Sequence, residues 1–150
     1  GMEPLMQTNS ERLMLEGVET GARTFEDFLR ESQWSRDEIQ VSFAHQVTVA
    51  HRRLMYERLR LDTSHDFSTV EWLGNTGSAA LPCTMAIGAQ TGRIQTGDHV
   101  AMLGIGSGIN CVMLAVQWGQ SRVACDDQTL ATLPEPAPRQ AVHSPASVTL

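Results

Sequence analysis

The stretch WLGNTGSAALPCTMAIGA, residues 72–89, joins a glycine-rich turn to a segment that has almost no polar side chains. Small and apolar residues fill positions 78–89, and Thr84 is nearly the only polar side chain among them. A helix that is apolar on all sides is expected to be buried on all sides. One sheet covers only one side of such a helix, so this segment predicts a central helix that needs a second covering surface.

Strands and helices are predicted to alternate on either side of this segment. The apolar spacing predicts helices over 9–31, 47–61 and 78–91, the first with a capping box at Thr8 and Glu11. Short β-prone runs predict strands over 4–9, 40–45, 66–72, 99–106 and 109–118, the last two buried. The order (β)αβαβαββ is typical of an α/β protein, here with a mixed five-stranded sheet covered by helices.

The composition limits the classes of function. The chain has 150 residues and a formal net charge of −6, which argues against non-specific binding to nucleic acid or to an anionic membrane. No apolar run is long enough to span a bilayer, and the three cysteines have no spacing typical of a metal site or a disulfide framework. We expect a cytoplasmic domain over residues 3–118, without a metal, followed by a flexible tail over 119–150.

Two polar residues are predicted to follow strands. His45 comes at the end of one predicted strand and Asn75 follows another, and open α/β sheets bind ligands beyond the carboxyl ends of their strands. If the strands are parallel neighbours, the imidazole and the amide both donate hydrogen bonds to one carbonyl oxygen, and so stabilise an oxyanion or enolate. The simpler interpretation is a loop histidine and an ordinary turn asparagine.

Three further groups of residues have both a simple and a functional interpretation. The sequence GIGSG, residues 104–108, predicts a tight hairpin whose backbone N–H groups at Gly106 and Ser107 are candidate oxyanion donors. Arg52 and Arg53 lie on a basic helix, which is either a solvated face or a contact for an acidic carrier protein or for coenzyme A. The cysteines are expected to be unreactive: Cys83, Cys111 and Cys125.

Taken together, FAHQVTVAHRR, LGNTGSAALPCTMAIGAQTGRIQTGDHV and GIGSGINCVMLAVQW resemble the C-terminal half of a 3-oxoacyl-(acyl-carrier-protein) synthase III, a condensing enzyme of the thiolase superfamily. The resemblance covers about residues 5–118. It implies one half of a thiolase-like fold and a Cys-His-Asn site, in which His45 and Asn75 bind the thioester carbonyl of the second substrate during a Claisen condensation. It also implies that the glycine hairpin helps to form the oxyanion hole.

The resemblance implies thioester substrates, on acyl-CoA or acyl carrier protein, and no cofactor. None of the three cysteines lies in the nucleophile motif, which relatives have in their N-terminal half. We therefore expect this chain to supply the His and Asn to a site that is completed by an N-terminal thiolase-type half, or to form a homodimer in its place. The alternative is a non-catalytic remnant that binds acyl-CoA or a partner protein.

Overall fold

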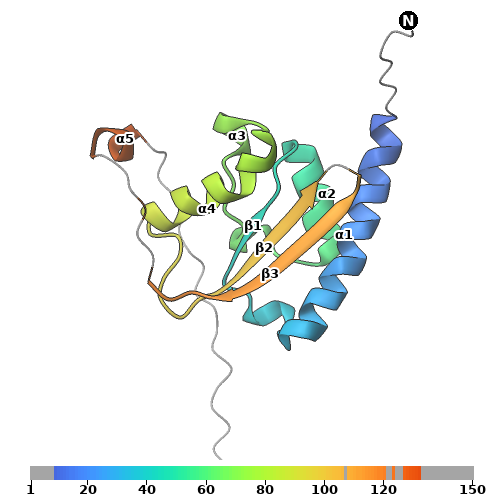
Figure 1. The fold of residues 1–150 in the computed structure, drawn as a ribbon, viewed down its shortest axis with the longest axis horizontal. Helices are drawn as coiled ribbons and strands as arrows, with labels where there is room; N and C mark the ends of the chain where they lie inside the picture. Colours follow the sequence, from blue (N-terminus) through green and yellow to red (C-terminus); the bar gives the residue numbers. More distant parts are fainter. Residues whose placement is uncertain (1–8, 107, 121–122, 124–126, 133–150) are drawn as a thin grey trace, which may run out of the picture.

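The computed structural model describes residues 9–106, 108–120, 123 and 127–132. Within these residues the sheet has three strands in the order β1-β2-β3: β1 (Val41–Ala44), β2 (His99–Gly106) and β3 (Asn110–Gln117). β1 pairs with β2 in parallel, with Val41 opposite Val100, and β2 pairs with β3 antiparallel (Figure 1). The prediction of an α/β protein with a mixed sheet is confirmed, whereas the described sheet has three strands rather than five. The strand predicted at 4–9 falls almost entirely outside the described residues.

Helices α1 (Ser10–Ser32) and α2 (Val49–Leu59) cover one face of the sheet (Figure 1). The α1 stripe follows the predicted spacing, and Phe25 and Phe28 pack in the core with Leu103 of β2. The N-cap of α1 is Asn9, whose side chain accepts a hydrogen bond from the Arg12 N–H at 2.9 Å, so the prediction of a box at Thr8 is wrong. Thr8 itself lies outside the described residues.

One face of α2 is buried. His51, Met55 and Leu59 form its inward stripe with Tyr56, whereas Ala50 is exposed. Residues four apart share one side of a helix, and this stripe packs against α1. The helix begins after Thr48, whose hydroxyl oxygen accepts a hydrogen bond from the His51 N–H at 3.1 Å. Because Thr48 caps α2, His45 stays in the short connection that follows β1.

Helix α4 (Ala80–Gln90) lies on the other face of the sheet and corresponds to the apolar helix predicted over 78–91 (Figure 1). Its buried residues are Ala80, Thr84 and Gly88, so the polar threonine points inward, while Cys83 is exposed. A Cβ on Gly88 would lie 2.7 Å from the Phe43 ring, so only glycine permits this close approach to β1. Within the described residues the sheet thus covers one side of α4, as expected for a helix on a single sheet, and the second covering surface stays a prediction.

The predicted strand over 66–72 is not a strand. Asp66 makes one isolated parallel bridge to Ser42 of β1, and residues Val70–Leu73 then form the short helix α3. The described residues also form short 3-10 turns: η1 (Arg36–Glu38), η2 (Thr63–His65) and η3 (Gly77–Ala79). The turn η1 is capped, since the Ser35 N–H donates to the Glu38 carboxylate at 2.7 Å.

No residue of β3 is fully buried, which corrects the expectation that both strands of the hairpin are buried. Val112 and Leu114 are 63% and 51% exposed on the face that α4 shares. α4 packs over β1 and β2 and leaves these two side chains uncovered. In the tail, the structure describes a short helix, α5 (Asp127–Thr132). None of the described helices is both long and apolar enough to cross a membrane.

Candidate functional site

His45 follows β1 directly, as predicted. Its backbone N–H donates to the Leu103 carbonyl oxygen at 2.9 Å, which continues the β1–β2 ladder by one residue and fixes the start of the connection. The side chain is half-buried and lines two hollows, both of which also include Ala44 and Arg52. Burial lowers the pKa of His45 below its ordinary value, so the imidazole is neutral at pH 7 and offers one N–H donor.

Asn75 lies in the turn between α3 and η3 rather than after a strand. Its Oδ1 accepts a hydrogen bond from the Gly77 N–H at 2.9 Å, which is an Asx turn. Gly74 and Gly77 flank it with φ of 65° and 63°, the region that favours glycine. This geometry matches the simple interpretation of a turn asparagine. The bond uses the side-chain oxygen, so the amide nitrogen keeps its character as a donor.

The structure does not bring His45 and Asn75 into contact. Among the residues it describes, no hydrogen bond joins the two side chains, and neither hollow lined by His45 includes Asn75, which is exposed. Their joint action on one carbonyl oxygen therefore remains a prediction.

The glycine hairpin forms where it was predicted. Gly106 ends β2 opposite Asn110, and Gly108 and Ile109 complete the turn with φ of 75° and 53°. Ser107, the candidate backbone donor, lies outside the described residues. Gly104 and Ile105 line the first hollow together with His45, so the end of β2 that leads into the hairpin borders that hollow.

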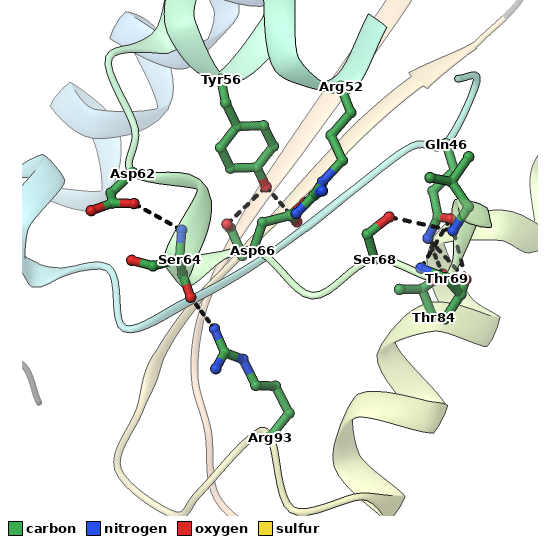
Figure 2. Close-up of polar contacts among 12 residues, drawn as sticks. Gln46, Arg52, Tyr56, Asp62, Ser64, Asp66, Ser68, Thr69, Thr84 and Arg93 are labelled. Atoms are coloured by element: carbon green, nitrogen blue, oxygen red, sulfur yellow. Dashed lines mark hydrogen bonds and ion pairs between the residues drawn. The ribbon is translucent and has the colours of Figure 1, made fainter. Parts of the chain in front are cut away.

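Arg52 does not present a free guanidinium to a carrier protein. Its Nε pairs with the carboxylate of Asp66, whose side chain is only 2% exposed (Figure 2). The Tyr56 hydroxyl donates to the same carboxylate at 2.6 Å and lies 2.8 Å from the Ser42 Oγ. Burial raises the pKa of Asp66, and the Arg52 charge and the Tyr56 bond act in the opposite direction. Arg53, one residue further along α2, is exposed.

Sequence reasoning missed this ion pair and a second polar cluster formed by Gln46, Thr69 and Thr84 (Figure 2). Local patterns assigned Asp66 and Thr69 to a strand. The one available signal was the polar Thr84 inside an apolar helix, because a buried hydroxyl requires a partner.

A second histidine, His51, lines the first hollow and is 8% exposed. Burial lowers the pKa of His51, and the charge of His45 lowers it further. Below about pH 6.5 the unfolded chain therefore binds more protons than the folded chain. The contribution of His51 to the free energy of unfolding is fully present above that pH and is lost as the pH falls.

We expect the free energy of unfolding to fall between pH 7 and pH 5, with His51 contributing at most about 1.4 kcal/mol per pH unit. Replacing His51 with leucine removes this group from the titration and flattens the dependence. Urea denaturation at pH 5, 6 and 7 measures the two slopes. Equal slopes for His51→Leu and the unaltered chain would contradict the assignment.

Comparison with known proteins places these features in one family. Residues 29–118 match the family described as 3-oxoacyl-(acyl-carrier-protein) synthase III C terminal. The chain is 37% identical over 113 residues to an acyl-CoA:acyl-CoA alkyltransferase of Shewanella oneidensis, covering 75% of this chain and 32% of the relative. It is 30% identical over 101 residues to a β-ketoacyl-(acyl-carrier-protein) synthase III of Vibrio vulnificus, covering 67% of this chain and 28% of the relative.

Solved structures agree with these relatives. OleA of Xanthomonas campestris, crystallised with lauric acid and lauroyl-CoA, matches with a TM-score of 0.71 and 31% identity over 74% of this chain and 33% of that one. FabH of Xanthomonas oryzae matches with a TM-score of 0.71 and 32% identity over 74% and 33%. The chain thus spans about a third of the length of the proteins it resembles.

Proposed function

Because the chain belongs to the 3-oxoacyl-(acyl-carrier-protein) synthase III C-terminal family, we propose that it is the C-terminal domain of a Claisen-condensing acyltransferase of fatty-acid or related lipid or polyketide synthesis. The observation that supports this best is His45. It stands at the carboxyl end of β1, half-buried, neutral at pH 7, and lines two hollows. This is where an open α/β sheet holds a ligand.

In the proposed reaction His45 and Asn75 donate hydrogen bonds to the carbonyl oxygen of a thioester. The α-carbon of that thioester loses CO2 when the substrate is a malonyl thioester, or a proton to a base when it is an acyl-CoA, and the electron pair left behind forms the enolate. Negative charge therefore grows on the carbonyl oxygen, and the two donors stabilise the transition state more than the ground state. The enolate carbon then attacks an acyl group held on a cysteine, which leaves as thiolate. Backbone N–H groups of the hairpin after Gly106 are the proposed donors to the second oxyanion.

Acyl-CoA and acyl carrier protein thioesters are the proposed substrates, and the reaction requires no cofactor beyond them. The names of the relatives support both carriers: one is an acyl-CoA:acyl-CoA alkyltransferase, the other a synthase named for acyl carrier protein, and OleA was crystallised with lauroyl-CoA. We place the reaction in the cytoplasm. Arg53, rather than the paired Arg52, is the remaining candidate for contact with an acidic carrier or with coenzyme phosphates.

The nucleophilic cysteine is proposed to come from a thiolase-type half outside the described residues, in the same or another polypeptide. Support comes from the share of the relatives' length that this chain spans and from its uncovered apolar surface. Val112 and Leu114 of β3 are exposed on the face of the sheet that α4 shares, and Cys83 of α4 is exposed as well. Exposed apolar patches of this kind mark sites of association.

Alone, the chain is expected to form a homodimer through this apolar surface, because a second copy covers the same side chains that the thiolase-type half would cover. Light scattering at micromolar concentration measures the mass in solution. Replacing Leu114 with glutamate places a charge on the surface without touching the core, so it should shift the mass to that of a monomer. A monomeric unaltered chain would contradict the expectation.

A condensation assay tests the proposal, using two acyl-CoA substrates or an acyl-CoA with a malonyl thioester. The chain is assayed alone and with an N-terminal thiolase-type half. Product only in the mixture supports the proposed role. Product from the chain alone would show that its own cysteines suffice, against the proposal.

The exposed position of Asn75, away from His45, favours one second candidate, a non-catalytic domain that binds acyl-CoA or a partner. Binding of acyl-CoA without product in any mixture would support that candidate instead.

A further inference from the structure

Three buried polar side chains meet between the sheet and α4. Gln46, Thr69 and Thr84 are 5%, 2% and 1% exposed. They come from three different segments: Gln46 directly follows His45, Thr69 precedes α3 and the Asn75 turn, and Thr84 lies in α4 just beyond that turn. The connection that carries His45 and the segments before and after the Asn75 turn thus each contribute one polar side chain to the same buried cluster.

Hydrogen bonds link all three side chains (Figure 2). The Thr69 N–H donates to the Gln46 Oε1 at 3.2 Å, and the Gln46 Nε2 donates to the Thr69 Oγ1 at 3.1 Å and to the Thr84 Oγ1. The two threonine hydroxyls are 2.8 Å apart. Both ends of the Gln46 amide are therefore used, which leaves this side chain one orientation.

Apolar side chains would fill this space as well and would need no partners. Directional bonds do something that packing alone does not, because they fix the distance and angle between the segments they join. The connections involved have little regular structure: residues 45–48 run between β1 and α2, and residues 74–76 between α3 and η3. Other bonds on these connections include that from the His45 N–H to Leu103 of β2 and that from the Gly77 N–H to Asn75.

We propose that Gln46, Thr69 and Thr84 form a polar clamp that positions His45 relative to the Asn75 turn. The inference rests on the proposed function, since it concerns the geometry of that site. Gln46 is a positioning residue and touches no substrate. Its neighbour His45 takes its orientation from this connection, and Thr84 holds the first half of α4, the helix to which the turn leads through η3.

The test compares two substitutions of Thr84 with a control substitution at the end of the same helix and with a substitution of Gln46. Thr84→Val removes the hydroxyl and keeps the shape of the side chain, whereas Thr84→Ser keeps the hydroxyl. Thr91→Val is the control on the same helix, because the Thr91 hydroxyl bonds only within α4, to Ile87 at 2.8 Å and more weakly to Gly88. Gln46→Leu removes the centre of the clamp.

In the chain assembled with its thiolase-type half, Thr84→Val and Gln46→Leu should lower kcat about 10- to 100-fold, the effect of a small misplacement of a reacting group. KM should change little, and Thr84→Ser and Thr91→Val should stay close to the unaltered enzyme. Equal rates for Thr84→Val and Thr84→Ser would overturn the proposal, as would a loss of kcat that follows the melting temperature across all variants.

A second readout separates the clamp from the proposed function. Amide hydrogen exchange in the chain itself reports on Thr69, whose N–H is bonded to Gln46, and on Gly77, whose N–H is bonded to Asn75. Exchange at both should be faster in Thr84→Val and Gln46→Leu and unchanged in Thr84→Ser. If the unaltered assembly makes no product, the proposed function fails while faster exchange still supports the clamp. Unchanged exchange at Gly77 would overturn the clamp itself.

Discussion

Replacing His45 with alanine is expected to lower kcat/KM for condensation by at least about 100-fold in the chain assembled with its thiolase-type half. Loss of one preorganised donor to a developing oxyanion costs about 100- to 1,000-fold. The melting temperature should change little, because His45 is half-buried and its structural bond is made by the backbone N–H to Leu103. Steady-state rates with two acyl-CoA substrates or with a malonyl thioester measure the effect.

His45→Gln provides the matched variant. Its side-chain amide keeps an N–H donor near the imidazole position, so its rate should fall between those of the unaltered enzyme and His45→Ala. If His45→Ala keeps more than about a tenth of the activity, the oxyanion is stabilised elsewhere and His45 has no such role.

Replacing Asp66 with alanine is expected to destabilise the fold by about 3 kcal/mol, the lower end of the range for breaking a buried ion pair. Removing the carboxylate takes the acceptor from the Tyr56 hydroxyl and the partner from Arg52. The effect is near the lower end because Arg52 is 25% exposed and turns toward water when unpaired. Urea denaturation at pH 7 measures the change.

Two variants separate the parts of this network. Asp66→Asn keeps an acceptor for Tyr56 without the charge, and Tyr56→Phe removes only the hydroxyl, so each should cost less than Asp66→Ala. Since burial raises the pKa of Asp66, the folded chain holds that proton more tightly, and the carboxylate lowers stability as the pH rises above about 3.8. Asp66→Ala within about 1 kcal/mol of the unaltered chain would contradict the importance of the network.

Local patterns predicted the elements whose bonds lie within a helix or a hairpin. Helix α1, strand β1 and the β2–β3 hairpin form at their predicted places. The predicted strand at 66–72 failed because of a distant side chain. Phe67 donates to Ser42 of β1 at 3.0 Å, as a strand residue would, but the next N–H in this register, that of Thr69, donates to Gln46 instead. Pairing therefore stops, and α3 begins.

The same long-range cluster explains why the polar Thr84 of α4 points inward. Periodicity registers which residues are apolar but not how closely a helix approaches its neighbour. Gly88 brings α4 against Phe43, and Gln46 provides the partner that makes an inward Thr84 tolerable. Both partners lie far away in the sequence, so no local window contains them.

The candidate site was predicted in part. The place of His45 after a strand followed from the sequence pattern, and its role follows from the resemblance to a family. The structure assigned Arg52 to Asp66, which no spacing rule indicates because the two residues lie on different segments. The side chain of Asn75 accepts a hydrogen bond within its own turn, and a site shared with His45 stays a prediction.

The burial pattern of α4, whose small and polar residues face inward, also determines which positions of this domain can be redesigned. Its inward stripe leaves no room, since a Cβ on Gly88 would meet the Phe43 ring at 2.7 Å. Its outward side, with Val112 and Leu114 beside it, contributes little to the core of the isolated domain. Replacing the exposed apolar residues on that side with charged ones would therefore give a domain that needs no covering partner. Adding apolar residues there would instead create contacts for a designed partner. In the isolated domain, change is therefore tolerated on the outward side of α4 and not along its inward stripe.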